Sequence, residues 1–367
     1  MAEIKITARE QDGIFSTIFV AAMDESDNTL SKGRFTMASS GFCNTFVKAM
    51  LPRGIATPVE NRRGGLVRQM FDHMHALAVE EDVAVSILHP FSFSYYNKFG
   101  YEKVADHLIV RFPTRMIDFV PRQCRFVPYE SRMLPDMISV YDQFAKGRNL
   151  LLSRFDDRYY KDKKTYICYD GDLPIAYVVF STSKTLYINN FRDTLLTVNE
   201  MAYTSPAGLR EIFSFLRMFE GEFDEIELRD LSLYSEAELL LRHYTHTKYA
   251  PLPDLSVKIL NTKAMLCAND YPQNEGEFTV KIIDSLPTTA GTYKVSYGGG
   301  DSKVSRLADT ADADVTLPAG AFARLIYGYD PLTADSLRYM EGVEITNPNE
   351  DIFRAFPKRP CGIFEHF

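Results

Sequence analysis

The chain has 367 residues, of which 46% are hydrophobic and 25% are charged, and its formal net charge is −8. This length predicts two or three domains, and the composition is that of a globular protein. No run of the sequence approaches the ~20 apolar residues of a membrane helix. The acidic balance argues against nucleic acid as a partner, because phosphates need a basic surface, and it is compatible with a cationic substrate such as a polyamine, a basic antibiotic or lysine.

The first residues, 1–5, contain no apolar signal core, which predicts a cytoplasmic protein without membrane contact. Five cysteines are scattered along the chain: Cys43, Cys124, Cys168, Cys267 and Cys361. Their spacing forms neither a disulfide framework nor a CxxC-type metal motif, so we expect free thiols. Since no His, Cys or carboxylate cluster has metal-ligand spacing either, we predict no metal.

The clearest local unit covers residues 54–101. Residues 54–57 are typical of a strand end, and residues 58–65 form a loop with two closing glycines. A helix is predicted next, because apolar residues recur at helical spacing at Leu66, Met70, Met74 and Leu77. Residues 83–88 are an apolar run typical of a buried parallel strand. The pattern predicts a strand–loop–helix–strand unit.

A fainter copy follows at residues 200–228. It again predicts a strand, a Pro-containing loop, a helix at residues 209–216 and a strand at residues 223–228. The loop is shorter: Ala56 to Gly65 is 9 positions, and Ala202 to Gly208 is 6. The second loop also lacks paired arginines. We interpret this segment as a duplicated domain that has lost its phosphate site.

Beyond Pro253 the pattern changes to period-2 alternation. Phe278, Val280 and Ile282 alternate, and so do the residues at 293–297, which predicts strands. Residues 298–301 predict a hairpin turn rather than a phosphate loop. With helices expected at 319–326 and 350–356, this segment is predicted to be an α+β domain.

The loop before the first predicted helix has the chemistry of a phosphate site. A helix N-terminus presents unpaired N–H groups to an anion, and glycines let the backbone approach it. Arginines add charge that reaches phosphate oxygens. The residues concerned are Arg62, Arg63, Gly64, Gly65 and Leu66. Such a loop suits coenzyme A as well as a dinucleotide, and the simplest alternative is a helix start with two exposed arginines.

Residues 55–67, followed by Phe99-Gly-Tyr-Glu102, resemble the acyl-CoA motif of the GNAT superfamily of N-acetyltransferases. Arg62, Gly65 and Val67 fall on its pattern Gln/Arg-x-x-Gly-x-Gly/Ala, although Val67 replaces the usual small residue. Tyr96-Asn-Lys-Phe-Gly-Tyr101 matches the Tyr-x-x-Phe-Gly-Tyr motif of the Eis (enhanced intracellular survival) group within that superfamily. The front end differs: the group has a longer helical lead-in before Gly54, and residues 1–53 look compressed, so the helices over the acceptor entrance are expected to be reduced.

This resemblance implies an α/β fold of tandem GNAT-like domains with mixed sheets, followed by an α+β sterol-carrier-like domain. The implied domains are a catalytic GNAT domain at 1–125, a degenerate GNAT domain at 126–255 and the sterol-carrier-like domain at 256–367. The group commonly forms hexamers, which implies a homo-oligomer.

The resemblance also implies the site. Acetyl-CoA would be the co-substrate, held by the phosphate loop and by the main chain of Ile55 and Thr57. Tyr96 would be the general acid, because a phenol with a pKa of ~10 is protonated at neutral pH. The α-carboxylate of the last residue, Phe367, would lie in the active site and orient the ammonium group of the acceptor; the alternative for Phe367 is a frayed terminus.

Three histidines lie in the same stretch of the sequence: His73, His75 and His89. His89 ends a predicted strand that borders the site, where a base is chemically reasonable, but a His-Pro pair there is also typical of a simple turn. His73 and His75 lie on the predicted helix and are expected to be solvated.

The predicted function is acetyl transfer from acetyl-CoA to an amine of a cationic small molecule, aminoglycoside- or polyamine-like, or of lysine. The alternative from a different class is a non-catalytic protein that binds CoA or an apolar ligand and retains a vestigial GNAT site.

Overall fold

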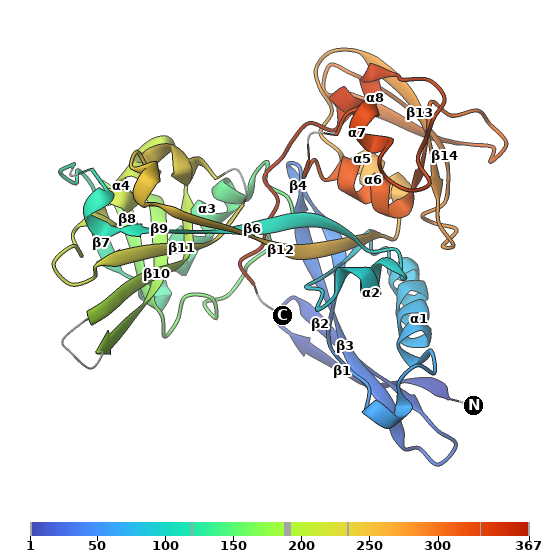
Figure 1. The fold of residues 1–367 in the computed structure, drawn as a ribbon, viewed down its shortest axis with the longest axis horizontal. Coiled ribbons are helices and arrows are strands. Elements are labelled where there is room, and N and C mark those ends of the chain that lie inside the picture. Colours follow the sequence, from blue (N-terminus) through green and yellow to red (C-terminus); the bar gives the residue numbers. More distant parts are fainter. Residues whose placement is uncertain (1, 119, 187–191, 233–234, 331, 366–367) are drawn as a thin grey trace. The chain divides into compact units, whose positions relative to one another are not determined.

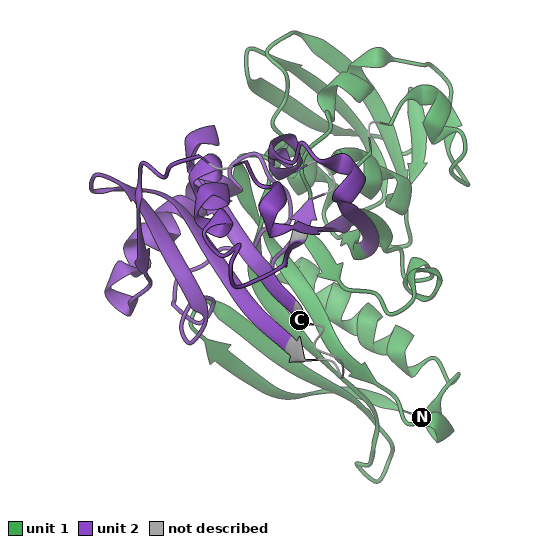
Figure 2. Cartoon of the chain, turned by 60° about the vertical axis from the view of Figure 1, so that its left-hand side comes forward, with its two compact units in different colours: residues 1–105, 254–361, 365–367 green, residues 106–253, 362–364 purple. Residues whose placement is uncertain are grey.

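The computed structural model describes residues 2–118, 120–186, 192–232, 235–330 and 332–365. The chain forms two compact units (Figure 2). Unit 1 contains residues 1–105, 254–361 and 365–367, and unit 2 contains residues 106–253 and 362–364. The chain therefore leaves unit 1, builds unit 2 and returns. The predicted division into three domains, with boundaries near 125 and 255, stays a prediction.

Unit 1 begins with a meander of antiparallel strands and has no helix among residues 2–56 (Figure 1). Phe35 of this sheet packs edge-on against Phe71 of the helix that follows, with ring centroids 5.7 Å apart. The compressed lead-in is therefore a sheet rather than a shortened helical segment. Its strands are β1 (Glu3–Asp12), β2 (Phe15–Met23), β3 (Thr29–Phe42) and β4 (Thr45–Ala56).

The predicted strand–loop–helix–strand unit is present. The 3-10 helix η1 (Val59–Asn61) lies in the loop, and α1 (Leu66–Glu80) covers one face of the meander through contacts with β1, β2 and β3. Strand β5 (Val85–Leu88) follows, then α2 (Phe93–Asn97). Leu66, Met70 and Met74 are buried in the core as the periodicity predicts, and Leu77 is partly buried there.

The second part of unit 1 returns after unit 2. The strand β12 (Lys248–Ile259) pairs antiparallel with β5 through residues 256–259, so that the order in unit 1 is β1-β2-β3-β4-β5-β12. A separate sheet of order β15-β14-β13-β16-β17 follows, and the predicted strands, the hairpin at residues 298–301 and the helix near 319–326 are all present. Its elements are α5 (Thr262–Ala268), β13 (Gly276–Ile283), β14 (Gly291–Gly298), β15 (Asp301–Leu307), β16 (Val315–Pro318), α6 (Ala319–Ile326), α7 (Ala334–Leu337), β17 (Glu344–Ile345) and α8 (Glu350–Ala355).

Unit 2 is also a mixed sheet with helices, in the strand order β6-β11-β10-β9-β8-β7. β10 and β11 are parallel, and α4 connects them, which is the strand–helix–strand unit predicted at 200–228. The elements are β6 (Glu102–Pro113, which begins in unit 1), η2 (Thr114–Met116), β7 (Arg125–Pro128), η3 (Ser131–Met133), α3 (Leu134–Ala145), β8 (Lys164–Asp170), β9 (Leu173–Leu186), β10 (Arg192–Tyr203), α4 (Pro206–Arg217), β11 (Glu225–Ser232), η4 (Glu236–Leu240) and η5 (Tyr244–His246).

The protein is thus a mixed α/β protein in both units. None of the helices in the described ranges is long and apolar enough to cross a membrane. All five cysteines are free thiols, as the sequence predicts.

Candidate active site

A cavity of about 850 Å³ opens in unit 1 between the end of β4, the loop before α1 and the segment around α2. Most of the residues singled out from the sequence line it together: Ile55, Thr57, Arg62, Arg63, Gly65, Leu66 and Tyr96. Gly64 lies in the same loop but outside this lining, and Phe367 lies outside the described residues. Sequence reasoning missed Arg68, Phe91 and Lys98, which also line the cavity.

Strand β4 diverges from β5 before it reaches the cavity. The two strands pair only through Ala49–Val85 and Met50–Ser86, whereas β12 pairs with the other edge of β5 along all of residues 85–88. Residues 51–56 of β4 consequently have no partner on the β5 side among the described strands. Their main-chain N–H and C=O groups on that side are available to an extended ligand.

A β-bulge marks the same stretch of β4. Between the pairs Arg34–Arg53 and Lys32–Ala56, two residues of β4, Gly54 and Ile55, oppose one residue of β3. Gly54 has φ = 60°, the left-handed conformation that glycine adopts at the first position of such a bulge. The bulge re-aims the main chain at the point where the strand turns away from β5.

The N-terminus of α1 is uncapped. Gly65 is the N-cap residue with φ = 76°, and no side chain hydrogen-bonds to the first turn. The first-turn N–H groups are therefore left for water or a ligand, and the helix dipole places positive potential there. This is the arrangement that binds a pyrophosphate.

Basic side chains surround this helix end. The Arg62 Nε donates to the Thr57 carbonyl oxygen at 3.1 Å, which holds the guanidinium beside the end of β4. Arg68 donates through Nη2 to the Lys98 carbonyl oxygen at 2.9 Å and lies over the Phe99 ring at 4.9 Å. Arg62, Arg63, Arg68 and Lys98 thus give the cavity a positive wall suited to phosphates.

Tyr96 also lines the cavity. It belongs to α2, whose first turn is capped by the Ser92 hydroxyl, which accepts from the Tyr95 N–H at 3.3 Å. Tyr96 is 6% exposed, and its hydroxyl has no hydrogen-bond partner among the described residues. Burial, together with the neighbouring Tyr95, raises the pKa of Tyr96 to about 12, so the phenol stays protonated at neutral pH.

The expectation that His75 is solvated is wrong, although His73 is exposed as predicted. The His75 Nε2 lies 3.1 Å from the Tyr101 hydroxyl, and that hydroxyl lies 2.6 Å from the Ser86 Oγ. Burial, with a smaller effect of Lys258, lowers the pKa of His75 to about 3, so the ring is neutral. The helix periodicity places position 75 on the buried face, and its burial is made tolerable by Tyr101, the residue before β6, which in turn contacts Ser86 of β5.

His89 fixes the C-terminal segment of unit 1. Its Nδ1 lies 2.7 Å from the Asp254 Oδ1, and its Nε2 lies 3.1 Å from the Glu365 carbonyl oxygen. Asp254 is 8% exposed. His89 is therefore more than a turn residue, because it ties the residue two positions before Phe367 to the end of β5.

The corresponding helix of unit 2 begins differently. The Ser205 hydroxyl caps α4 by accepting from the Gly208 N–H at 3.3 Å. Gly208 is packed so tightly that an added Cβ would lie 2.7 Å from the Ile175 carbonyl oxygen. This N-terminus is occupied by its own cap, which accords with the interpretation that the second copy lacks a phosphate site.

One group of possible metal ligands occurs in the described part of the chain. Cys124, Cys168 and Glu211 of unit 2 place their ligand atoms within 4.8 Å of one another, although they are far apart in sequence. Burial raises the pKa of both thiols, and Glu211 already accepts the N–H groups of Gln123 and Cys124. A cysteine binds a metal as the thiolate, and a raised pKa keeps both thiols protonated, so this environment disfavours a metal site. The absence of a metal stays a prediction.

Comparison with known proteins places the cavity in a defined domain. Residues 8–104 match the family model of the acetyltransferase (GNAT) domain. No curated protein is significantly similar to the chain in sequence.

Solved structures with the same fold cover nearly the whole chain. A GCN5-related N-acetyltransferase from Anabaena variabilis has a TM-score of 0.82 at 18% identity, with 95% of this chain and 89% of that chain covered. A conserved protein of unknown function from Enterococcus faecalis has a TM-score of 0.82 at 16% identity, covering 96% and 89%. Eis1 from Mycobacterium abscessus has a TM-score of 0.79 at 14% identity, covering 95% and 90%.

The GNAT domain spans all the cavity-lining residues, and GNAT enzymes use acetyl-CoA as co-substrate. The chain is an acyltransferase.

Proposed function

We propose that the chain is an acetyl-CoA-dependent N-acetyltransferase that transfers the acetyl group directly to an amine. The observation that carries this proposal is one cavity joining the unpaired end of β4, the uncapped N-terminus of α1 and the Tyr96 hydroxyl. The pyrophosphate of acetyl-CoA would bind the first turn of α1, with Arg62 and Arg63 beside it. The pantetheine arm would extend along residues 55–57 through main-chain hydrogen bonds.

In the proposed transfer the chain supplies main-chain hydrogen-bond donors and the proton of Tyr96. The neutral amine attacks the thioester carbonyl, so that a C–N bond forms and the C–S bond breaks. The developing oxyanion accepts hydrogen bonds from the main chain near the bulge of β4, and the departing thiolate takes the Tyr96 proton. The amine loses its extra proton to solvent, and Tyr96 regains one from water.

The C-terminus is proposed to contribute a carboxylate. Glu365, two positions before Phe367, is held at the end of β5, where its carbonyl oxygen lies 3.1 Å from the His89 Nε2. The proposed role of the Phe367 α-carboxylate, to orient the ammonium group of the acceptor, rests on the sequence resemblance. Mass spectrometry of the purified protein checks that Phe367 is the last residue, and a version extended by a few residues should fold normally but lose activity; full activity of the extended protein contradicts this role.

The sequence-based expectation of a cationic acceptor, aminoglycoside- or polyamine-like or a lysine, depends on the net charge and on the resemblance. Cytoplasmic location, assembly into a homo-oligomer and a sterol-carrier-like nature of residues 256–367 also stay predictions from the sequence.

The proposed function is tested by acetyl-CoA binding and by thiol release. Acetyl-CoA at 100 times its Kd should stabilise the protein by about 2.7 kcal/mol, seen as a rise in Tm. Arg62→Glu should abolish that rise, whereas Arg338→Glu, at an exposed arginine of unit 1 without an ion pair in the described ranges, should keep it. Thiol release is then measured over a panel of amines that includes cations.

The outcomes separate the two classes of function. Thiol release that depends on an amine supports the transferase. Binding of acetyl-CoA without thiol release from any amine favours the non-catalytic CoA-binding protein.

A further inference from the structure

The face of the meander that points away from α1 carries a group of basic side chains. Phe35 packs against α1. Successive side chains of a strand point to opposite faces, and Lys32 and Arg34 are three positions and one position from Phe35 along β3, so they lie on the face away from α1. Arg53 pairs directly with Arg34 across the β3–β4 ladder and shares that face. We call Lys32, Arg34 and Arg53 the basic cluster.

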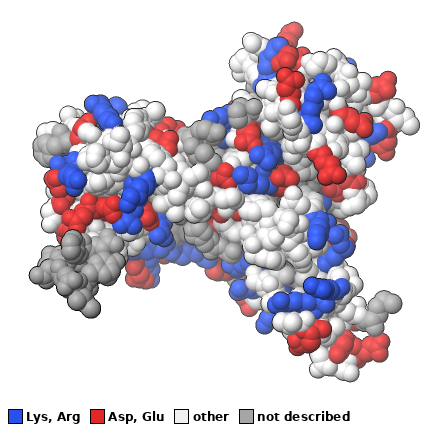
Figure 3. All heavy atoms as spheres, viewed as in Figure 1, with Lys and Arg blue, Asp and Glu red and all other residues white. Residues whose placement is uncertain are grey.

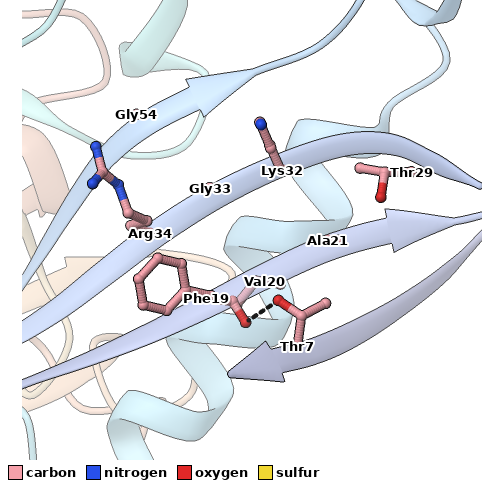
Figure 4. A pocket seen from close by; sticks show the side chains of 9 residues that line it. All are labelled: Thr7, Phe19, Val20, Ala21, Thr29, Lys32, Gly33, Arg34 and Gly54. Carbon is pink, nitrogen blue, oxygen red and sulfur yellow. Dashed lines mark hydrogen bonds between the residues drawn. The ribbon is translucent and has the colours of Figure 1, made fainter. Parts of the chain in front are cut away.

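A cavity of about 500 Å³ lies over this face (Figure 4). Lys32 and Arg34 project from β3 into it, and the Phe19 side chain of β2 and Gly54 of β4 also line it. The Arg34 guanidinium lies over Gly54, since an added Cβ there would be 3.1 Å from the Arg34 Nη2. No acidic residue lines the cavity among the residues that the structure describes.

The basic cluster has no counter-charge within the described ranges. None of its three members forms an ion pair there, and the Nε of Arg53 is buried without a hydrogen-bond partner. Burial and the neighbouring Arg34 lower the pKa of Arg53. Like charges directly opposite each other in a sheet cost stability. Arg53 lies beside Arg34 without lining the cavity, and an anion bound at Lys32 and Arg34 would supply the missing counter-charge.

The basic cluster adjoins the proposed reaction centre. Gly54 lines this cavity, and the next residue, Ile55, lines the acetyl-CoA cavity. The bulge at these two residues lies in the stretch of β4 that is not paired with β5. The two cavities therefore share one segment of main chain, and no helix among residues 2–56 covers the outer face.

We propose that this second cavity binds the acceptor, and that the basic cluster recognises an anionic group on it, so that the substrate is a small amine carrying a carboxylate or a phosphate. Arg34 offers the planar, multidentate donors that such oxygens prefer, Lys32 adds a second positive charge in the cavity, and Arg53 adds charge beside Arg34. The inference deepens the proposed acetyl transfer and rests on it. It departs from the cationic acceptor expected from the net charge of −8. Figure 3 shows acidic and basic side chains interspersed over the visible face, so the net charge does not fix the charge at the site.

The acceptor class is tested with matched amines in the thiol-release assay. Glycine is compared with glycinamide, glucosamine 6-phosphate with glucosamine, and spermidine serves as the polycation. We expect kcat/KM at least tenfold higher for the anionic member of one pair, and the responding pair identifies carboxylate or phosphate. Arg34→Gln should remove this preference mainly through the KM of the amine, with the KM of acetyl-CoA unchanged, and Arg338→Gln should leave both unchanged.

Preference for glycinamide, glucosamine or spermidine, or an anion preference that survives Arg34→Gln, overturns the proposal. A second measurement does not depend on the amine chosen. Inorganic phosphate and acetate are added to the acetyl-CoA-loaded protein at constant ionic strength, and at least one should raise the Tm of the wild type but not of Arg34→Gln or Arg53→Gln.

Equal Tm responses in wild type and variants, or no response to either ion, overturn the anion site. A response lost in the variants without acetylation of any amine supports the anion site and counts against the acetyl transfer. The two proposals can therefore fail separately.

Discussion

Tyr96 and His75 lie in the same aromatic core of unit 1. Burial raises the pKa of Tyr96 and lowers the pKa of His75. Each side chain is held in its neutral form, because the apolar surroundings penalise a charge. For Tyr96 this means a phenol that keeps its proton and faces a cavity. For His75 it means an imidazole that cannot act as a base near neutral pH, because the pKa is about 3 and the ring is bound to Tyr101. The same physical effect thus makes one group a candidate acid and the other a structural residue.

Replacing Tyr96 by Phe should lower kcat by roughly 10²–10⁴-fold, the usual contribution of a general acid. Acetyl-CoA affinity should be nearly unchanged, because the ring keeps its packing and the hydroxyl has no partner in the described part of the chain. Steady-state kinetics and calorimetric binding check both. With a pKa of about 12, the acid form should persist through pH 10, so wild-type kcat should not fall in alkaline buffer below that pH. An unchanged kcat in the variant removes Tyr96 as the acid.

His75→Gln should flatten the pH dependence of stability on the acidic side. The unfolded-state pKa is ~6.5 and the folded-state pKa is about 3, so the unfolded chain binds more protons between these values and stability falls as pH falls through that window. The loss should reach about 2 kcal/mol at pH 5 relative to pH 7, an order-of-magnitude figure. Urea unfolding at pH 5, 6 and 7 measures it. Equal slopes in wild type and variant would show that His75 is not the titrating group.

At the scale of elements, residues of strand β4 line two different cavities. Its bulge contributes Gly54 to the cavity over the basic cluster and Ile55 to the cavity at the N-terminus of α1. The helices α1 and α4 differ at their N-termini. α1 begins with Gly65 and no side-chain cap, whereas the first turn of α4 is bound by Ser205.

Gly54→Ala should cost about 1–2 kcal/mol of stability, because an L-residue is strained at φ = 60°. It should also raise the KM of acetyl-CoA, because relaxing the strain shifts the bulge. Gly171→Ala is the matched control: Gly171 has φ = 59° in the β8–β9 turn, and an added Cβ there meets no atom within 4 Å. Gly54→Ala should be the less stable of the two variants, because its added Cβ also lies 3.1 Å from the Arg34 Nη2. An identical KM of acetyl-CoA for the two variants would separate the bulge from cofactor binding.

At the scale of the whole chain, unit 1 is discontinuous in sequence. The strand β5 has residues 256–259 of β12 as its partner on one edge, and Leu260 completes the core under α1. The GNAT domain match ends at residue 104, well before these residues. The GNAT domain of this protein is therefore not a separable N-terminal piece.

A fragment of residues 1–105 should not fold stably, because β5 would become an unpaired apolar edge. We expect it to aggregate, or to show no cooperative thermal transition by circular dichroism, and to bind no acetyl-CoA. A soluble fragment that melts cooperatively and binds acetyl-CoA would contradict this view of unit 1.

The sequence by itself determined the local unit around the active site. The strand end, the glycine-rich loop, the apolar stripe of α1 and the buried β5 are encoded by neighbouring residues, and short-range signals suffice to predict them. The glycine-rich loop at residues 62–66 was predicted as a phosphate site from the same local signals, whereas Ile55, Thr57 and Tyr96 were predicted from the resemblance to the GNAT motifs.

Only the tertiary structure decided what depends on register and burial. The facing of Arg34 and Arg53 follows from the pairing of β3 with β4, and a shift of one residue would place them on opposite faces. The burial of His75, the binding of Glu365 to His89 and the grouping of Cys124, Cys168 and Glu211 join residues far apart in the chain. Such contacts arise from the packing of distant segments, which a local sequence pattern does not encode.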